Sequence, residues 1–177
     1  MIRCYVTDRR QGDLLTHVRS AVRNGVDYIQ VREKDLESRS LYELVCRVRD
    51  AAAGSATQVL VNDRLDVALA AGVAGVHLPG NGLPPAKVRP LVRVLGCSVH
   101  SISEAVAAES AGVDFVIFGP VFDTPGKTPV GLQALHAVTA VVRIPVLGIG
   151  GITLENREKV LEAGAAGIAA IRLFQRD

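Results

Sequence analysis

Two glycine-rich stretches in this sequence have the residue types of a phosphate site. Residues 119–127 (Gly-Pro-Val-Phe-Asp-Thr-Pro-Gly-Lys) and residues 148–152 (Gly-Ile-Gly-Gly-Ile) each directly follow a short β-branched run. A strand that ends in glycines presents bare backbone N–H groups, and α/β proteins bind phosphate with such groups because no side chain blocks the approach. The first stretch adds the Thr124 hydroxyl and the Lys127 ammonium group. Together they predict a binding site for a small phosphorylated ligand.

The elements that would position these stretches alternate along the chain. Short β-branched runs predict strands, and the longer amphipathic runs between them predict helices. The predicted strands are residues 3–7, 28–31, 58–61, 75–78, 94–98, 115–118, 146–149 and 167–171. The predicted helices are residues 14–24, 38–53, 64–71, 85–91, 102–111, 131–142 and 154–163. Four helices are followed by a glycine that predicts a left-handed helix end, at Gly25, Gly72, Gly112 and Gly164.

Strands that alternate with helices pair in parallel, because each helix supplies the crossover. An open doubly wound sheet shares this local pattern. Eight strands without a GxGxxG motif after the first one favour a closed (β/α)8 barrel, the TIM barrel fold. We therefore predict a compact α/β protein in which residues 1–177 form a single barrel domain.

The end of the predicted barrel is short. Only residues 172–177 follow the eighth strand, so the eighth helix is expected to be truncated or missing. An apolar strip around that strand, the helix at residues 14–24 and Phe174 would then face water, which is typical of an interface. We expect a homodimer that covers this strip.

Composition excludes several classes of function. The aromatic fraction is 4% and the formal net charge is +2, which argues against a protein that stacks nucleic-acid bases or binds a polyanion. No apolar run approaches the roughly 18 residues of a membrane-spanning helix, and no signal-peptide pattern opens the chain. Three cysteines, odd in number and far apart, favour reduced core thiols. We expect a cytoplasmic domain that binds neither nucleic acid nor membrane.

The functional rim of a (β/α)8 barrel lies at the carboxyl ends of its strands. Alternation places Gln30, Arg32 and Lys34 on one side of the second strand, so that a carboxamide and two cations converge on the rim. Barrels commonly bind phosphate between the loops after strands seven and eight. Here these loops offer backbone amides and a cation, at Gly150, Gly151, Ile171 and Arg172.

Other polar residues near the rim have a structural alternative. Asn62 and Asp63 follow the third strand and would either cap the next helix or hold a metal or a ligand. His77 is either a satisfied structural histidine or part of the site. Ser98 is expected to face the rim, whereas His100 would pack at the start of the next helix.

In their order and spacing, these motifs resemble the thiamine phosphate synthase and thiazole tautomerase (TenI-like) superfamily over essentially the whole chain. The matching segments are residues 30–34 (QVREK), 61–64 (VNDR), 75–78 (GVHL), 98–100 (SVH), 119–124 with Lys127, and 148–152 (GIGGI). The resemblance implies a (β/α)8 barrel enzyme of thiamine biosynthesis. The synthases are transferases that join hydroxymethylpyrimidine diphosphate to thiazole phosphate, release pyrophosphate and need Mg²⁺.

The resemblance also implies roles for the matching residues. Catalysis would fall to Arg32, Lys34 and Lys127, and the Asp63 carboxylate would hold Mg²⁺. Cations and Mg²⁺ on the leaving diphosphate would lower the barrier of a dissociative reaction. The residues that would bind the phosphorylated pyrimidine and thiazole are Gln30, Asn62, His77, Ser98, Thr124, Gly150, Gly151, Ile171 and Arg172.

The sequence departs from the pattern of the superfamily in three places. Gly82 stands where the synthases carry a second Mg²⁺ carboxylate, Gly126 replaces a threonine of the diphosphate loop, and Pro120 stands where the tautomerases carry a catalytic histidine. Three functions stay open: a synthase with one protein carboxylate on Mg²⁺, a tautomerase-like isomerase that uses His77 or His100, and a non-catalytic barrel that binds thiazole phosphate or thiamine phosphate. The retained diphosphate clamp favours the synthase.

Overall fold

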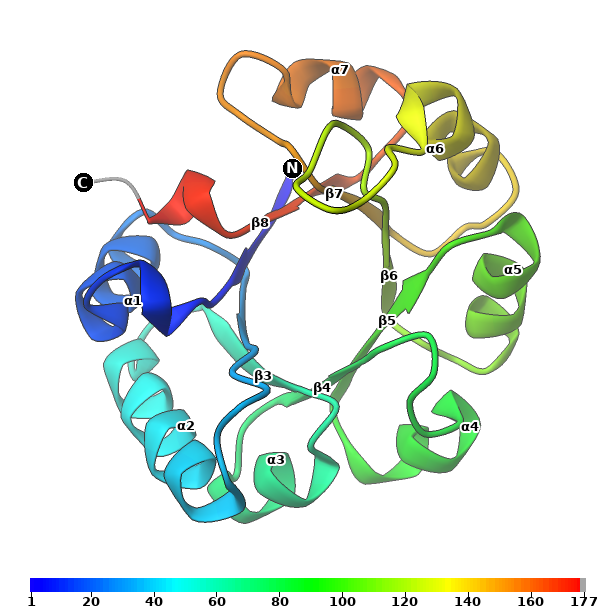
Figure 1. The fold of residues 1–177 in the computed structure, drawn as a ribbon. Helices are drawn as coiled ribbons and strands as arrows, with labels where there is room; N and C mark the ends of the chain where they lie inside the picture. The colour runs from blue at the N-terminus through cyan, green and yellow to red at the C-terminus, as the bar shows by residue number, and fades with distance from the viewer. Residues whose placement is uncertain (176–177) are drawn as a thin grey trace.

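The computed structural model describes residues 1–175, which contain a closed barrel of eight parallel strands, viewed along its axis in Figure 1. Consecutive strands pair around the whole ring, and β8 pairs with β1, with Ile2 opposite Gly167. The predicted (β/α)8 fold is confirmed, and each predicted strand end lies within one residue of the observed end. The strands are β1 (Ile2–Val6), β2 (Tyr28–Val31), β3 (Gln58–Asn62), β4 (Gly75–Leu78), β5 (Val94–Val99), β6 (Phe115–Phe118), β7 (Val146–Ile149) and β8 (Gly167–Ala170).

The helices lie outside the ring of strands (Figure 1). They are α1 (Leu14–Arg23), α2 (Ser38–Ala52), α3 (Leu65–Ala71), α4 (Pro85–Val88), α5 (Ile102–Ser110), α6 (Gly131–Thr139) and α7 (Arg157–Glu162). Three short 3-10 segments accompany them, namely η1 (Arg9–Gln11), η2 (Arg89–Leu91) and η3 (Arg172–Phe174). Among residues 1–175, no helix is long and apolar enough to cross a membrane.

Three helical patterns form α-helices that are three or four residues shorter than predicted, and the one at residues 131–142 ends at Thr139. The pattern at residues 85–91 divides into α4 and η2, because Pro90 lacks the amide that would continue an α-helix. The pattern at residues 154–163 becomes helical only from Arg157. Before that point the Asn156 side chain accepts a hydrogen bond from the Thr153 amide at 2.8 Å and holds a turn.

Glycines in positive φ end four of the helical segments, as predicted, at Gly25, Gly72, Gly112 and Gly164. Gly72 shows why the residue type matters. It is the C-cap of α3 with φ 65°, and its N–H group bonds to the carbonyls of Ala68 and Leu69. The left-handed conformation turns the chain back toward the next strand at little steric cost only for glycine.

Two apolar layers follow from the alternation of side chains along the strands. One layer fills the inside of the ring and includes Cys4, Leu60, Phe115 and Leu147. Tyr28 stacks on Phe115 there, with the ring centroids 4.9 Å apart. The other layer lies between the strands and the helices. Burial raises the pKa of the Cys4 thiol to about 12, so this side chain is a neutral core residue.

Among the described residues that follow β8, the chain forms the 3-10 turn η3 at the position where an eighth helix would lie. Phe174 packs on Tyr5 with ring centroids 6.0 Å apart, and the Gln175 carboxamide donates to the Tyr5 hydroxyl at 3.1 Å. Leu173 and Phe174 are half-buried, and the apolar side of α1 is buried. The expected water-exposed strip around β8 is therefore wrong, because η3 and α1 cover it.

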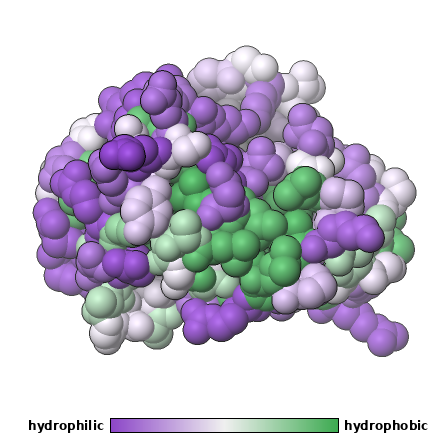
Figure 2. Space-filling view, turned by 90° about the horizontal axis from the view of Figure 1, so that it is seen from below, coloured by the Kyte–Doolittle hydropathy of each residue, from purple (hydrophilic) through white to green (hydrophobic). Residues whose placement is uncertain are grey.

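Exposed apolar side chains gather elsewhere on the barrel. Figure 2 shows an apolar area on the outer side between α3 and α4. Leu69 and Leu91 line a shallow groove there, and their exposed fractions are 50% and 52%. The homodimer stays a prediction, and the strip on which it was based is not exposed.

Replacing Phe174 with alanine is expected to lower the free energy of unfolding by about 1–3 kcal/mol. The loss is smaller than for a fully buried phenylalanine, because the Phe174 ring is only half-buried. It is not negligible, because removing the ring uncovers Tyr5. Urea unfolding followed by circular dichroism measures the change. Leu91→Ala, at an exposed apolar position, is the control and should change stability by less than about 0.5 kcal/mol. Equal losses in the two variants would show that η3 does not protect the barrel wall.

Candidate functional site

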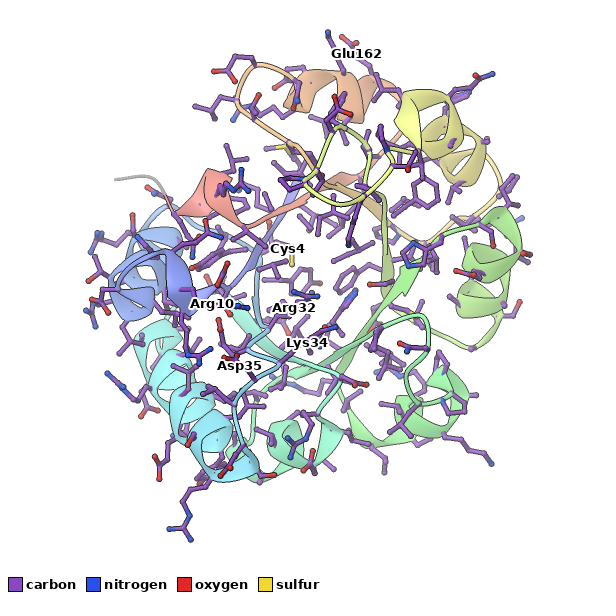
Figure 3. The ribbon with its side chains drawn as sticks, in the orientation of Figure 1. Cys4, Arg10, Arg32, Lys34, Asp35 and Glu162 are labelled. Carbon is purple, nitrogen blue, oxygen red and sulfur yellow. The ribbon has the colours of Figure 1, made fainter. Side chains whose placement is uncertain are left out.

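The barrel mouth is the rim formed by the carboxyl ends of the eight strands, and β2 brings two cations to it. Gln30 is buried inside the ring, while Arg32 and Lys34 continue on the same side of the chain and are exposed. Figure 3 shows Arg32 and Lys34 toward the barrel axis and Asp35 nearer to α2. As predicted, the Gln30 carboxamide and the cations of Arg32 and Lys34 lie on one side of the chain at the mouth.

Glu33 lies between Arg32 and Lys34 in the sequence, and its carboxylate is buried. Glu33 was not among the site residues predicted from the sequence. Its oxygens accept hydrogen bonds from the Thr7 hydroxyl at 2.7 Å, from the Arg9 amide at 3.0 Å and from the Arg9 guanidinium at 3.2 Å. The Thr7 hydroxyl oxygen also accepts the Arg32 amide at 3.0 Å. A chain of hydrogen bonds thus fixes the backbone from which Arg32 and Lys34 extend. The alternation of side chains along the strand could have indicated this position, because it turns Glu33 away from the mouth.

Arg9 also forms an ion pair with Asp35, the second acidic residue of this segment. Its guanidinium forms two hydrogen bonds to the Asp35 carboxylate, at 2.7 and 2.8 Å, and lowers the pKa of Asp35 to about 2. Within residues 1–175, no carboxylate forms an ion pair with Arg32 or Lys34. The pairing leaves two uncompensated positive charges at the mouth.

The β3 end presents one carboxylate to the mouth. Asp63 is exposed and has φ 64°, which is uncommon for a residue other than glycine and points to a functional constraint. Its amide donates to the His77 carbonyl at 3.0 Å. The capping alternative for Asn62 and Asp63 is wrong, because Arg64 is the N-cap of α3 and makes no side-chain capping bond. Asn62 is buried at the end of its strand.

The position of Gly82 relative to Asp63 bears on a metal. A Cβ atom at Gly82 would lie 3.1 Å from the Asp63 Oδ1 atom, so a side chain at position 82 would point at this carboxylate. Among residues 1–175, no group of three His, Cys, Asp or Glu side chains could hold a metal ion. Any Mg²⁺ here would use Asp63 as its protein carboxylate and take its other oxygens from water and phosphate.

His77 and Ser98 form a pair inside the ring just below the mouth. The His77 Nε2 atom lies 2.8 Å from the Ser98 hydroxyl oxygen, and burial lowers the pKa of His77 to about 3. The ring is 2% exposed, whereas Ser98 is half-buried and faces the mouth as predicted. His100 is exposed, and its amide donates to the Glu104 carboxylate at 2.7 Å at the start of α5.

The two glycine-rich stretches lie against each other. The Val121 amide donates to the Ile149 carbonyl at 2.7 Å, and the Phe122 amide donates to the Gly150 carbonyl at 3.1 Å. A Cβ atom at Gly150 would lie 2.4 Å from the Pro120 Cβ atom. The glycines therefore serve a second purpose besides ligand approach, because they let the loop after β6 pack directly on the turn after β7.

The turn after β7 has the geometry of an anion cradle. Gly150 and Gly151 have φ 98° and 63°. Among the described residues, none accepts a hydrogen bond from the amides of Gly150, Gly151 or Ile152. The Asn156 carboxamide donates to the Gly151 carbonyl at 2.9 Å and fixes the turn. Asn156 was missed by sequence reasoning, because its position was expected inside a helix.

Three further predicted residues surround this cradle. A Cβ atom at Gly150 would lie 3.2 Å from the Thr124 hydroxyl oxygen, so Thr124 stands beside the glycine turn. Lys127 is exposed, and its amide closes a turn to the Thr124 carbonyl at 3.0 Å. Ile171 directly follows β8 as the N-cap of η3, and Arg172 opens η3 with an exposed side chain. The structure thus brings the predicted residues together around one mouth, which suits the binding of phosphorylated ligands.

Comparisons with known proteins find similarity along nearly the whole chain. A family model described as thiamine monophosphate synthase matches residues 4–174. The chain is 39% identical to a thiamine-phosphate synthase of Chlorobium limicola over 98% of this chain and 85% of the relative. It is 41% identical to one of Methanoculleus marisnigri, over 94% and 83%. A solved structure of a thiamine phosphate pyrophosphorylase from Pyrococcus furiosus superposes with a TM-score of 0.89 at 35% identity, over 96% of this chain and 85% of that one.

Thr7→Val is expected to weaken the binding of inorganic pyrophosphate by about fivefold, because it breaks the hydrogen bonds that hold the Arg32 backbone and leaves the charges unchanged. Isothermal titration calorimetry measures the affinity. The matched control is Thr57→Val, which removes a buried hydroxyl that donates to the Val26 carbonyl at 2.7 Å. Thr57 precedes β3 at the opposite end of the barrel, so its loss should cost stability without affecting binding. Equal binding by both variants would refute a role of Thr7 at the mouth.

Proposed function

This chain belongs to the thiamine monophosphate synthase family, and we propose that it is a thiamine-phosphate synthase of thiamine biosynthesis. In the proposed reaction, hydroxymethylpyrimidine diphosphate couples to thiazole phosphate and releases pyrophosphate. One observation carries the proposal. Within residues 1–175, cations without an ion-pair partner at the β2 end and amides without an acceptor at the β7 end face the same barrel mouth. Two separate phosphate-binding regions match a reaction between two phosphorylated substrates.

The proposed clamp for the diphosphate consists of Arg32, Lys34 and Lys127. These side chains are exposed at the mouth and come from two loops. When the bond between the pyrimidine methylene and the diphosphate oxygen breaks, negative charge grows on the leaving group. Fixed cations at that place stabilise the transition state more than the ground state. Gln30 and Asn62 would bind the pyrimidine from the barrel interior.

The other phosphate would bind at the glycine turn. The amides of Gly150 and Gly151 donate to no acceptor among residues 1–175 and would bind the phosphate, and the turn at Ile171 and Arg172 would add further donors. Anchoring the thiazole by its phosphate holds its ring nitrogen over the pyrimidine methylene. Such positioning converts an encounter of two substrates into a reaction within one complex.

The residues present fit Mg²⁺ as a cofactor of the proposed reaction. Asp63 is an exposed carboxylate at the mouth, and no described residue donates a hydrogen bond to it. Mg²⁺ commonly keeps several waters and binds through one or two carboxylates and substrate phosphates. When bound, the ion would neutralise charge on the diphosphate.

Two observations disfavour the isomerase alternative. One of its two candidate histidines, His77, is only 2% exposed, and Pro120 stands where the tautomerases carry their histidine. The non-catalytic alternative is disfavoured as well, because a protein that only binds a monophosphate does not need cations for a diphosphate. The substrates are small phosphorylated metabolites, so we also propose a cytoplasmic location for the enzyme.

With both substrates and Mg²⁺, the purified protein is expected to release pyrophosphate in step with thiamine phosphate formation. Lys127→Ala should lower kcat on the order of 100-fold, because one stabilising contact to the leaving group is lost. A coupled pyrophosphate assay measures both. Lys87→Ala, which removes an exposed lysine on α4, serves as the control and should be fully active. Failure of the folded wild-type protein to form thiamine phosphate would reject the proposed function.

A second carboxylate is expected to strengthen the Mg²⁺ dependence. In wild type, Mg²⁺ should bind weakly alone and more tightly with pyrophosphate, because Asp63 is its one protein carboxylate. Gly82→Asp places a second one beside it and should lower the Mg²⁺ concentration for half-maximal rate several-fold. A substituent at position 82 also approaches the Pro79 ring at 2.9 Å, so Gly82→Asn controls for crowding. Identical Mg²⁺ curves for Asp and Asn at position 82 would exclude this position from the metal site.

A further inference from the structure

The His77 ring is held in one orientation inside the barrel. It is 2% exposed, and its Nε2 atom lies 2.8 Å from the Ser98 hydroxyl oxygen. Its centroid lies 5.9 Å from that of Phe115. On the other edge of the ring, the Nδ1 atom has no hydrogen-bond partner among the described residues. A buried polar atom without a partner calls for an explanation.

Gly96 explains the environment of this atom. A Cβ atom at Gly96 would lie 2.6 Å from His77 Nδ1 and 2.5 Å from the Phe115 ring. Glycine carries only a hydrogen in that direction, so a Cα–H group lies beside Nδ1. An unprotonated nitrogen accepts such a weak contact, whereas a proton on Nδ1 would be a buried donor without an acceptor.

The tautomer of His77 determines which way the Ser98 hydroxyl is oriented. If Nδ1 carries no proton, a neutral ring must carry its proton on Nε2, and Nε2–H donates to the Ser98 oxygen. The Ser98 O–H group is then free to donate toward the mouth. With the other tautomer, the Ser98 proton would point back at the ring, and a ligand would meet only an acceptor.

We propose that His77 is a positioning residue whose Nε2–H group holds Ser98 as a hydrogen-bond donor toward the substrate. The proposal rests on the proposed function, since it assigns the ligand atom at Ser98: an acceptor lone pair, on either a diphosphate oxygen or a pyrimidine ring nitrogen. The low pKa of His77, caused first by burial and then by the charge of Arg32, agrees with a ring that stays neutral. His77 itself touches no substrate.

Nitrogen-15 NMR of the imidazole groups tests the tautomer directly, without any turnover. The chain has four histidines, and the His17→Gln, His100→Gln and His136→Gln variants assign the signals of the other three, which leaves those of His77. Wild type should show a protonated Nε2 and an unprotonated Nδ1 for His77, unchanged between about pH 5 and 8. A proton on Nδ1, or a ring that titrates in that range, would overturn the proposal even if no variant at position 77 folds.

A double-mutant cycle tests the action through Ser98. Inorganic pyrophosphate and the unphosphorylated hydroxymethylpyrimidine are the two probes, because they separate the two possible acceptors. For one of them, His77→Leu should weaken binding about tenfold in wild type but not in the Ser98→Ala background. His77→Gln, which keeps a donor near the Nε2 position, should restore most of the affinity. Additive losses, or equal behaviour of Leu and Gln, would reduce His77 to a packing residue.

The two proposals can fail separately. A protein with the Nε2–H tautomer and a coupled His77–Ser98 pair, but no thiamine phosphate formation, keeps the positioning role and loses the synthase function. An active synthase with a proton on His77 Nδ1 keeps the synthase function and loses the positioning role.

Discussion

Closure of the ring by hydrogen bonds between β8 and β1 is the interaction on which the site depends. Every strand runs in the same direction, so closure collects all eight carboxyl ends at one mouth. Arg32 and Lys127 lie far apart along the chain, and no local interaction joins them. They face one opening because each follows a strand of the same closed sheet. The short η3 turn is sufficient for this purpose, since it covers the wall at the closing pair of strands.

The acidic and basic side chains after β2 are separated because they point in different directions. Residues 32–35 contain two basic and two acidic side chains, which would cancel if they were mixed in solvent. Alternation turns Glu33 away from the axis, and Arg9 binds both acidic groups. Of the charges of this segment, the two basic ones remain beside the axis. A segment that is neutral in sum thus acts as a cationic surface, and the arginine that makes this possible comes from the loop after β1.

The strands, the barrel and most rim residues could be predicted, because alternation and helix-ending glycines are local signals. Residues 28–31 and 146–149 have the predicted ends for this reason. Glu33, Asn156 and the contact of Gly96 with His77 could not be predicted in the same way, since each role depends on a segment distant in sequence or on a turn that replaces a predicted helical start. The apolar strip around β8 was wrong for a related reason. Its prediction assumed that a missing helix leaves a gap, but Phe174 packs on Tyr5 across that position.

The interior thiol of Cys4 gives the barrel its own reporter of opening. The side chain has no exposed surface, and Figure 3 shows it within the ring of strands. An alkylating reagent can reach it only when neighbouring strands separate, and the thiolate that such reagents attack forms only when water enters. The rate at which Cys4 is alkylated therefore measures how often the sheet opens, without an engineered cysteine.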